Sequence, residues 1–167
     1  RRGSLKPPVH PERDRTTIVL NVDQARAVSG IIEPARTTTL LHGITGSGKT
    51  QVYIEAAKRM MESGKSTIML VPEIALTSQL IAEVTPHFPR VIITHSTMTE
   101  AERHLVWQTC LDSNEPYIVI GPRSALYMPL PHLGLVIIDE CHEPSFKQDK
   151  SPRYSALRVA AKLTQLA

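Results

Sequence analysis

The chain has 167 residues, of which 41% are hydrophobic and 21% charged, with a formal net charge of +3. These values are typical of one globular domain with its own core. The positive balance permits nucleic-acid binding without demonstrating it. No apolar run approaches the ~20 residues that span a bilayer, so no membrane partner is expected. Cys110 and Cys141 have no metal-binding spacing and suggest no disulfide framework, which favours a reducing cytoplasm.

The predicted elements begin after a basic, proline-rich stretch at residues 1–17, which we interpret as a linker or extended segment. A helix is expected from Asn21, because Asn21 can cap it and Gln24 stands at the capping-box spacing. Residues 38–41 are expected to form a strand that enters a glycine-rich loop, and residues 51–60 a helix that leaves it.

Short apolar segments then alternate with helical patterns. Strands are expected at 66–71, 90–94, 117–121 and 135–139, and helices near 73–85, 99–112 and 154–166. Strands rich in Val and Ile that are apolar on both sides indicate a parallel sheet covered on both faces. The alternation predicts an α/β fold built from βαβ units, with ligands bound beyond the carboxyl ends of the strands.

The glycine-rich loop at residues 43–50 matches the phosphate-binding pattern G-x-x-x-x-G-K-[ST] at every fixed position. Glycines allow the backbone turns that point N–H groups at phosphates, and the following helix directs its positive end to the same place. Lys49 adds a full charge, and the hydroxyl of Thr50 suits Mg²⁺. The loop residues expected to bind nucleotide are Gly43, Thr45, Gly46, Ser47, Gly48, Lys49 and Thr50.

An acidic pair, Asp139-Glu140, follows the apolar run 135–138 about ninety residues after the loop. Asp139 is expected to supply the carboxylate that complements Thr50 at Mg²⁺, through a metal-bound water, and Glu140 is placed to orient or deprotonate an attacking water. An acidic pair after a buried strand is ordinarily a solvated strand end. Together with the loop, it predicts a magnesium–nucleotide site in which Lys49, Asp139 and Glu140 are the catalytic candidates.

Three further polar stretches follow the other expected strands. They contain Pro72 and Thr77, then His95 and Ser96, and then Arg123 and Ser124. Each could be only a strand-to-helix turn with a capping hydroxyl. The functional alternative is that they line a groove for a nucleic-acid backbone. Because only 4% of residues are aromatic, no long base-stacking platform is expected.

In this order the motifs resemble the first motor lobe of a superfamily 2 helicase, and more narrowly the replication-restart helicases of the primosomal protein N′ (PriA) family. The similarity covers roughly residues 18–167. Its most specific strings are Pro-Glu-Ile-Ala-Leu at 72–76 and Lys-Gln after the acidic box. The matching residues are 20–24, 43–50, 71–77, 95–96 with 102–103, 123–126, 139–143, and 146–148 with 152–154.

The resemblance implies a RecA-like P-loop NTPase lobe, residues 18–167, of an ATP-dependent 3′→5′ DNA helicase. It implies that Gln24 contacts adenine and that His142 links the nucleotide site to a second lobe. Phe146, Lys147 and Gln148 would couple DNA binding to hydrolysis, and Pro72, Thr77, His95, Ser96, Arg123 and Ser124 would contact DNA. The implied cofactors are ATP and Mg²⁺, with zinc only in another part of the parent protein.

The implied partners are single-stranded or forked DNA, the remainder of the parent helicase, and primosome and single-strand-binding proteins, in a bacterial cytoplasm. The chain is expected to be a fragment, without the second lobe that brings an arginine to the nucleotide. Three alternatives remain: another superfamily 2 translocase, a nucleotide-binding regulatory module, and a small-molecule kinase. A kinase of this fold usually has an arginine-rich lid segment, which is not evident here.

Overall fold

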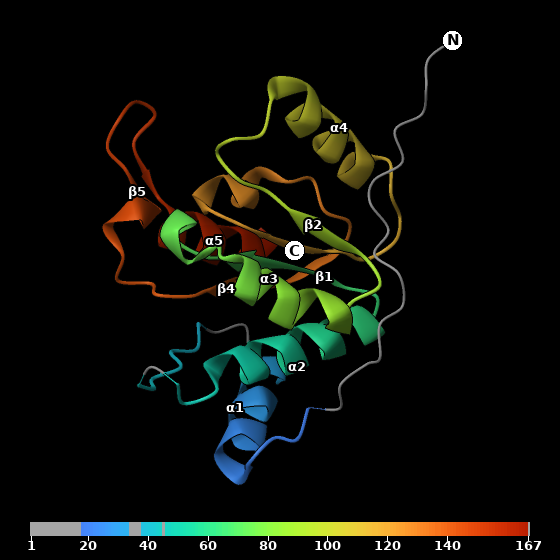
Figure 1. Ribbon diagram of the computed structural model, residues 1–167, viewed down its shortest axis with the longest axis vertical. Coiled ribbons are helices and arrows are strands. Elements are labelled where there is room, and N and C mark those ends of the chain that lie inside the picture. The colour runs from blue at the N-terminus through green and yellow to red at the C-terminus, as the bar shows by residue number, and fades with distance from the viewer. Residues whose placement is uncertain (1–17, 34–37, 45, 167) are drawn as a thin grey trace.

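A computed structural model describes residues 18–33, 38–44 and 46–166. Its centre is a parallel sheet of four strands in the order β2-β3-β1-β4 (Figure 1). Leu70 of β1 is level with Gly121 of β3 and with Ile138 of β4, so the carboxyl ends of the strands form one edge. The strands are β1 (Ser66–Leu70), β2 (Val91–Ile93), β3 (Ile118–Gly121) and β4 (Leu133–Ile138). The predicted parallel sheet is confirmed, each strand lying within two residues of its expected bounds.

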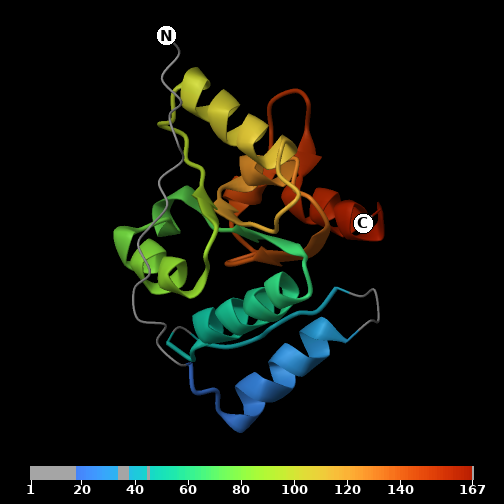
Figure 2. The ribbon, with the colours of Figure 1, turned by 90° about the vertical axis from the view of Figure 1, so that its right-hand side faces the viewer.

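Helices cover both faces of the sheet, as predicted (Figures 1 and 2). Asn21 caps the first helix and forms the expected capping box with Gln24. Thr99 and Glu102 form a second capping box at the start of α4. The helices are α1 (Val22–Ile32), α2 (Lys49–Glu62), α3 (Ser78–Val84), α4 (Glu100–Leu111) and α5 (Ala156–Leu166).

Alternate residues of each strand enter two separate cores. Ile68 and Leu70 of β1 join the cluster that includes Cys110 of α4 and Ala160 of α5. Met69, between them, joins the cluster that includes Ile54 and Ala57 of α2 and Val84 of α3. Because successive side chains of a strand point to opposite faces, an apolar strand of this kind must be covered on both sides.

Short elements occupy the carboxyl edge of the sheet. Three 3₁₀ turns and a two-stranded antiparallel ribbon follow β1, β3 and β4 there, whereas a fourth turn lies between α3 and β2. They are η1 (Glu73–Ala75), η2 (Thr85–His87), η3 (Arg123–Tyr127), η4 (Pro144–Phe146), β5 (Lys147–Gln148) and β6 (Tyr154–Ser155).

Two expectations differ from the structure. Residues 38–41 form no strand: they run beside α1 and α2, away from the sheet (Figure 2), and Leu40 is 77% exposed. A strand needs a hydrogen-bonded neighbour, which this segment lacks among the described residues. The helix expected at 73–85 is divided, because Thr77 caps a new helix by accepting a hydrogen bond from Leu80 N–H. The linker expected at 1–17 lies outside the described residues, and none of the described helices is long and apolar enough to cross a membrane.

Candidate functional site

The phosphate-loop motif ends in a backbone conformation that requires glycine. Gly46 and Gly48 have φ angles of 80° and 79°, and Gly48 is the residue that precedes α2. A side chain with a Cβ is disfavoured in this left-handed region. The loop therefore turns sharply into the first turn of α2, whose N–H groups have no acceptors within the helix. Thr45, the remaining predicted loop contact, lies outside the described residues.

Lys49 closes the loop on itself. Its Nζ donates hydrogen bonds to the carbonyl oxygens of Gly43, at 2.8 Å, and Ile44, at 3.0 Å. The ammonium group thus lies inside the turn that the motif forms. A phosphate oxygen can replace these carbonyls as a stronger, charged acceptor.

Gln24 lies against the same loop, although it comes from α1. Its Oε1 accepts the N–H of Asn21, and its Nε2 makes longer contacts of 3.3–3.5 Å with Ser47 O, Gly48 O and Gln51 Oε1. A Cβ added at Gly48 would collide with this amide. The structure therefore brings Gln24 to the loop, while the adenine contact that the resemblance implied remains a prediction.

The acidic pair lies at the end of β4 and is bonded to the phosphate-loop helix. Tyr53, on α2, donates its hydroxyl to Asp139 Oδ1 at 3.2 Å. Burial, followed by the charge of Asp139, raises the pKa of Tyr53 well above its ordinary value, so the phenol stays protonated and remains a donor. The contact joins the two motifs, which are about ninety residues apart in sequence.

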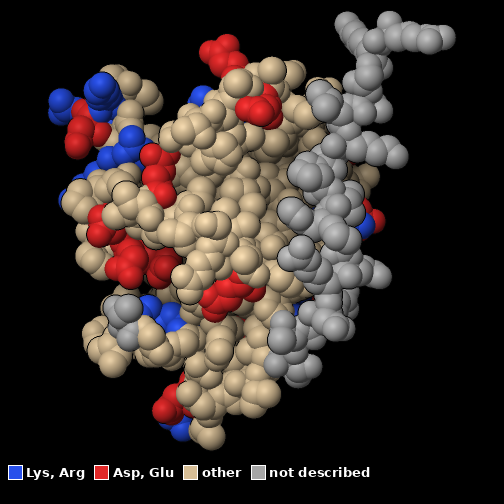
Figure 3. Space-filling view, viewed as in Figure 1, with Lys and Arg blue, Asp and Glu red and all other residues tan. Residues whose placement is uncertain are grey.

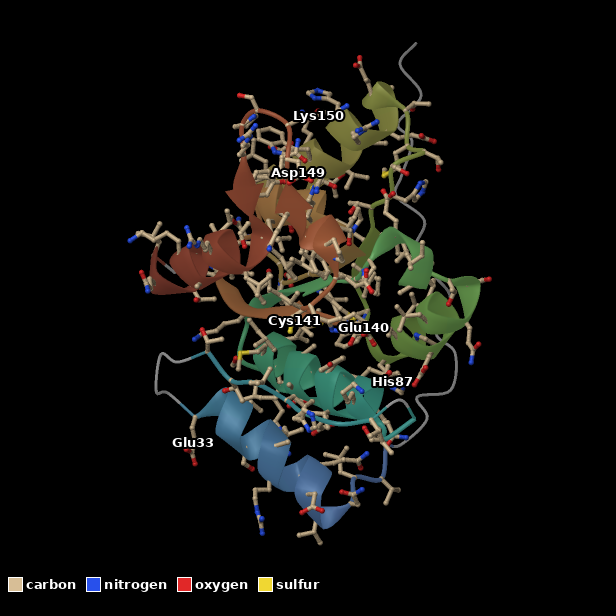
Figure 4. The ribbon with its side chains drawn as sticks, turned by 90° about the vertical axis from the view of Figure 1, so that its left-hand side faces the viewer. Glu33, His87, Glu140, Cys141, Asp149 and Lys150 are labelled. Atoms are coloured by element: carbon tan, nitrogen blue, oxygen red, sulfur yellow. The ribbon has the colours of Figure 1, made fainter. Side chains whose placement is uncertain are left out.

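Glu140 sits in a strained backbone conformation. Its φ is +49°, which is uncommon for a residue with a side chain and costs of order 1–3 kcal/mol. Its N–H donates to Asp139 Oδ1 at 3.1 Å, and its carbonyl accepts the N–H of Glu143 at 2.8 Å. The resulting turn holds Glu140 and Cys141 at the carboxyl edge beside α2 (Figure 4). His142 Nε2 lies 3.5 Å from Glu140 Oε2, on a largely exposed side chain.

The donor set of the site fits a hard divalent cation. Thr50 lies one turn before Tyr53 on α2, so both side chains lie on the helix face that meets Asp139. A hydroxyl and a carboxylate are the oxygen ligands that Mg²⁺ takes while keeping most of its waters. No three His, Cys, Asp or Glu residues gather at metal-binding distance at this site or at any other in the described part of the chain.

A groove of about 880 Å³ lies beyond the carboxyl ends of β1, β2 and β3, and the segment that follows β4 also lines it. It contains the predicted DNA contacts Pro72, His95, Ser96, Arg123 and Ser124, and its wall includes the buried Phe146. Thr77 does not line it; its hydroxyl caps α3, the structural role that the sequence left open. The lining residues are Val71–Ile74, Thr94–Ser96, Arg103, Trp107, Pro122–Ser124, Tyr127, Met128, Glu143, Ser145 and Phe146.

Arg123 connects this groove to the segment after the acidic pair. Its Nη1 donates to the carbonyl oxygens of Ser145, at 2.8 Å, and Lys147, at 2.5 Å. Lys147 and Gln148, two of the expected coupling residues, form β5 and pair with β6. The basic side chains at the upper left of Figure 3 lie over this ribbon and its connecting loop, which carries Asp149 and Lys150 in Figure 4.

Tyr53 and Trp107 are among the residues of the site that were not predicted from the sequence. Tyr53 carried a usable signal, because its spacing of three from Thr50 places it on the same helix face. Trp107, on the groove wall, carried none beyond being the only tryptophan of the chain. Its place depends on how α4 packs.

Comparison with known proteins places the chain in a family. Residues 17–166 match the family model described as type III restriction enzyme, res subunit (ResIII). The chain belongs to the ResIII family. The RecA-like helicase-lobe fold expected from the motifs is therefore confirmed.

The chain is also homologous to replication restart protein PriA. It is 40% identical over 149 residues to PriA of Bacillus subtilis (strain 168), covering 84% of this chain and 18% of that protein. Identity to PriA of Chlamydia pneumoniae is 40% over 154 residues, covering 89% and 20%, and to PriA of Treponema pallidum (strain Nichols) 41% over 150 residues, covering 89% and 23%. The resemblance to the PriA family is confirmed, and the chain spans about a fifth of the length of these relatives.

Proposed function

We propose that this chain is the ATP-binding motor lobe of an ATP-dependent DNA helicase that acts in replication restart. The observation that carries the proposal is the Tyr53–Asp139 hydrogen bond, because it brings the phosphate-loop helix and the acidic pair into one site. The groove lies at the same edge of the sheet as this site, and a strand of DNA can lie in it. The name shared by the relatives supports replication restart over a restriction-enzyme motor.

In this proposal the nucleotide is ATP with Mg²⁺, a hard cation that neutralises phosphate charge. Lys49 leaves the carbonyls of Gly43 and Ile44 and binds the β and γ phosphates. Thr50 and Asp139 supply the protein oxygens for the cation, and Tyr53 holds the Asp139 carboxylate in position. Glu140 orients the attacking water and accepts its proton, while Gln24 contacts the adenine edge.

The groove holds single-stranded DNA by its backbone. Arg123 has donors besides the Nη1 that binds Ser145 and Lys147, and these can reach a phosphate. A phosphate that draws Arg123 away from the two carbonyls loosens the 145–147 segment. Because this segment follows the acidic pair directly, the movement can reach Glu140 and His142, and we propose it as the route of coupling.

The proposal includes partners that lie beyond this chain. A second lobe of the parent protein supplies an arginine to the γ-phosphate, a contribution of about 10³–10⁵ in rate in related phosphoryl-transfer sites. His142 lies beside Glu140 in a position to receive that lobe. Forked DNA, primosome proteins and single-strand-binding protein are the proposed partners, and a bacterial cytoplasm the proposed location.

Titration calorimetry with ATP and Mg²⁺ tests the nucleotide site. Lys49→Ala should abolish the weak binding expected of a single lobe, because it removes the charge over the β and γ phosphates. Lys162→Ala, at an exposed position of α5, is the matched loss of one lysine and should leave binding unchanged. Equal affinity in the wild type and in Lys49→Ala would contradict the assignment.

DNA-stimulated ATP hydrolysis, measured in a chain extended through the second lobe, tests the groove. Arg123→Ala and Lys147→Ala should both lower the stimulation while sparing nucleotide binding. If both variants keep wild-type stimulation, DNA lies elsewhere and only the nucleotide assignment stands. The 167-residue chain alone should hydrolyse ATP hardly at all, with or without DNA.

A further inference from the structure

One wall of the groove is formed by the face of α4 that carries Arg103 and Trp107. These residues are four apart, so their side chains are neighbours on the helix surface. Both line the groove, and Trp107 is 42% exposed. An indole half open to a groove presents a large flat apolar surface, which a soluble domain ordinarily buries.

The groove is not lined by positive charge alone, as a site that binds only phosphates would be. Arg103 and Arg123 line it, but so do the carboxylates of Glu73 and Glu143. A polyanion held only by charge would be repelled by the two carboxylates. An uncharged, flat group can lie where a phosphate cannot, so this lining suits a ligand that alternates charged and flat units, which is the chemistry of a single-stranded nucleic acid.

We propose that Trp107 stacks on a base of single-stranded DNA and that Arg103, one helical turn away, binds an adjacent phosphate. The proposal rests on the proposed function and adds a base contact to a groove otherwise assigned to the backbone. Arg103 Nη2 already donates to Met98 O at 2.8 Å, which holds the guanidinium beside α4. Its remaining donors suit a phosphate.

The groove lining offers a second aromatic surface of the same kind. Tyr127 of η3 lines the groove and is 54% exposed. Its ring is held edge-to-face by Tyr154, with ring centroids 5.6 Å apart. Stacking tolerates every base, so a contact to Trp107 adds affinity without sequence preference.

The tryptophan fluorescence of the chain comes from Trp107 alone, because the chain contains no other tryptophan, so it can monitor the proposed contact. At low salt, an oligo-dT strand should quench the tryptophan emission of the 167-residue chain, in step with the rise in anisotropy of a labelled strand. A strand of the same length made of abasic sites keeps the phosphates and should bind without quenching.

The variants separate stacking from charge. Trp107→Ala should weaken oligo-dT binding by roughly 5- to 150-fold, the range for loss of one base stack, and leave the slope of affinity against salt unchanged. Trp107→Phe should keep most of the affinity. Arg103→Ala should reduce the slope of log affinity against log salt by about one unit, as expected for the loss of one phosphate contact. Leu105→Ala, at a similarly exposed apolar position of α4 outside the groove, should keep wild-type affinity, and circular dichroism checks the fold of each variant.

The outcomes distinguish this proposal from the one on which it rests. Binding of oligo-dT without quenching, or equal affinity in Trp107→Ala and Leu105→Ala, overturns the stacking contact and leaves the DNA groove intact. No anisotropy change with any strand at low salt overturns both. Equal quenching by the abasic strand places Trp107 beside the backbone and also overturns stacking.

Discussion

Gly48→Ala tests the geometry of the phosphate loop with the smallest possible change. Gly48 has a φ of 79°, a left-handed conformation that costs an alanine about 1–2 kcal/mol. The added Cβ also collides with Gln24 Nε2, which is the free end of a flexible side chain held by contacts of 3.3–3.5 Å. Displacing that amide costs little, so backbone strain dominates the loss of stability.

Gly64→Ala is the matched control. Gly64 follows α2 with a φ of 76°, and a Cβ there would meet no atom within 4 Å. Both variants should therefore lose about 1–2 kcal/mol of unfolding free energy, which lowers the melting temperature of a chain of this size by roughly 2–8 °C. Thermal unfolding followed by circular dichroism measures both.

Nucleotide binding should separate the two variants. Only Gly48 belongs to the phosphate loop that precedes α2, and a hydrogen bond to a charged group contributes about 1.5–3 kcal/mol. Gly48→Ala should thus weaken ATP binding by roughly 10- to 150-fold, and Gly64→Ala should not change it. Equal losses of affinity in the two variants, or an unaltered melting temperature in Gly48→Ala, would refute the reasoning. In the double variant Gln24→Ala, Gly48→Ala, the added Cβ no longer collides with the Gln24 amide, but the backbone strain at position 48 remains.

Two further changes test single contacts. Tyr53→Phe removes the donor to Asp139 Oδ1 and should weaken nucleotide binding measured by calorimetry with Mg²⁺, while binding without Mg²⁺ stays the same; equal effects in both conditions would contradict a positioning role. Donation from the N–H and hydroxyl of Thr99 holds the pKa of Glu102 below its ordinary value of 4.5, so this stabilisation is present above that pH and is lost as the pH falls through the folded value. Glu102→Gln should therefore have a lower melting temperature than the wild type at pH 7, and the difference should shrink in strong acid. A difference that does not change with pH would contradict the assignment.

Local sequence was sufficient where one residue type and its near neighbours decide the structure. The capping box of Asn21 and Gln24 joins groups three residues apart, so the start of α1 was predictable without any tertiary contact. The loop glycines were predictable for the same reason, because a left-handed turn before a helix excludes other residues.

Pairing and packing decided what the sequence left open. Residues 38–41 have the composition of a strand, yet a strand exists only beside a partner, and the chain leads this segment along α1 and α2 instead. Thr77 could cap a helix or face a groove, and only the fold shows that its hydroxyl accepts the N–H of Leu80. No partner within the chain was predicted for Arg123 from the sequence, whereas the fold places two carbonyls against it.

The sequence by itself determined the parallel α/β fold, the phosphate loop and the acidic pair, because strand apolarity, glycine conformation and motif spacing are local properties of the chain. The tertiary structure alone decided that Tyr53 bonds to Asp139 and that Trp107 lies on the groove wall. These contacts join residues from different elements. Their geometry follows from how the helices pack on the two faces of the sheet, and no local pattern encodes that packing.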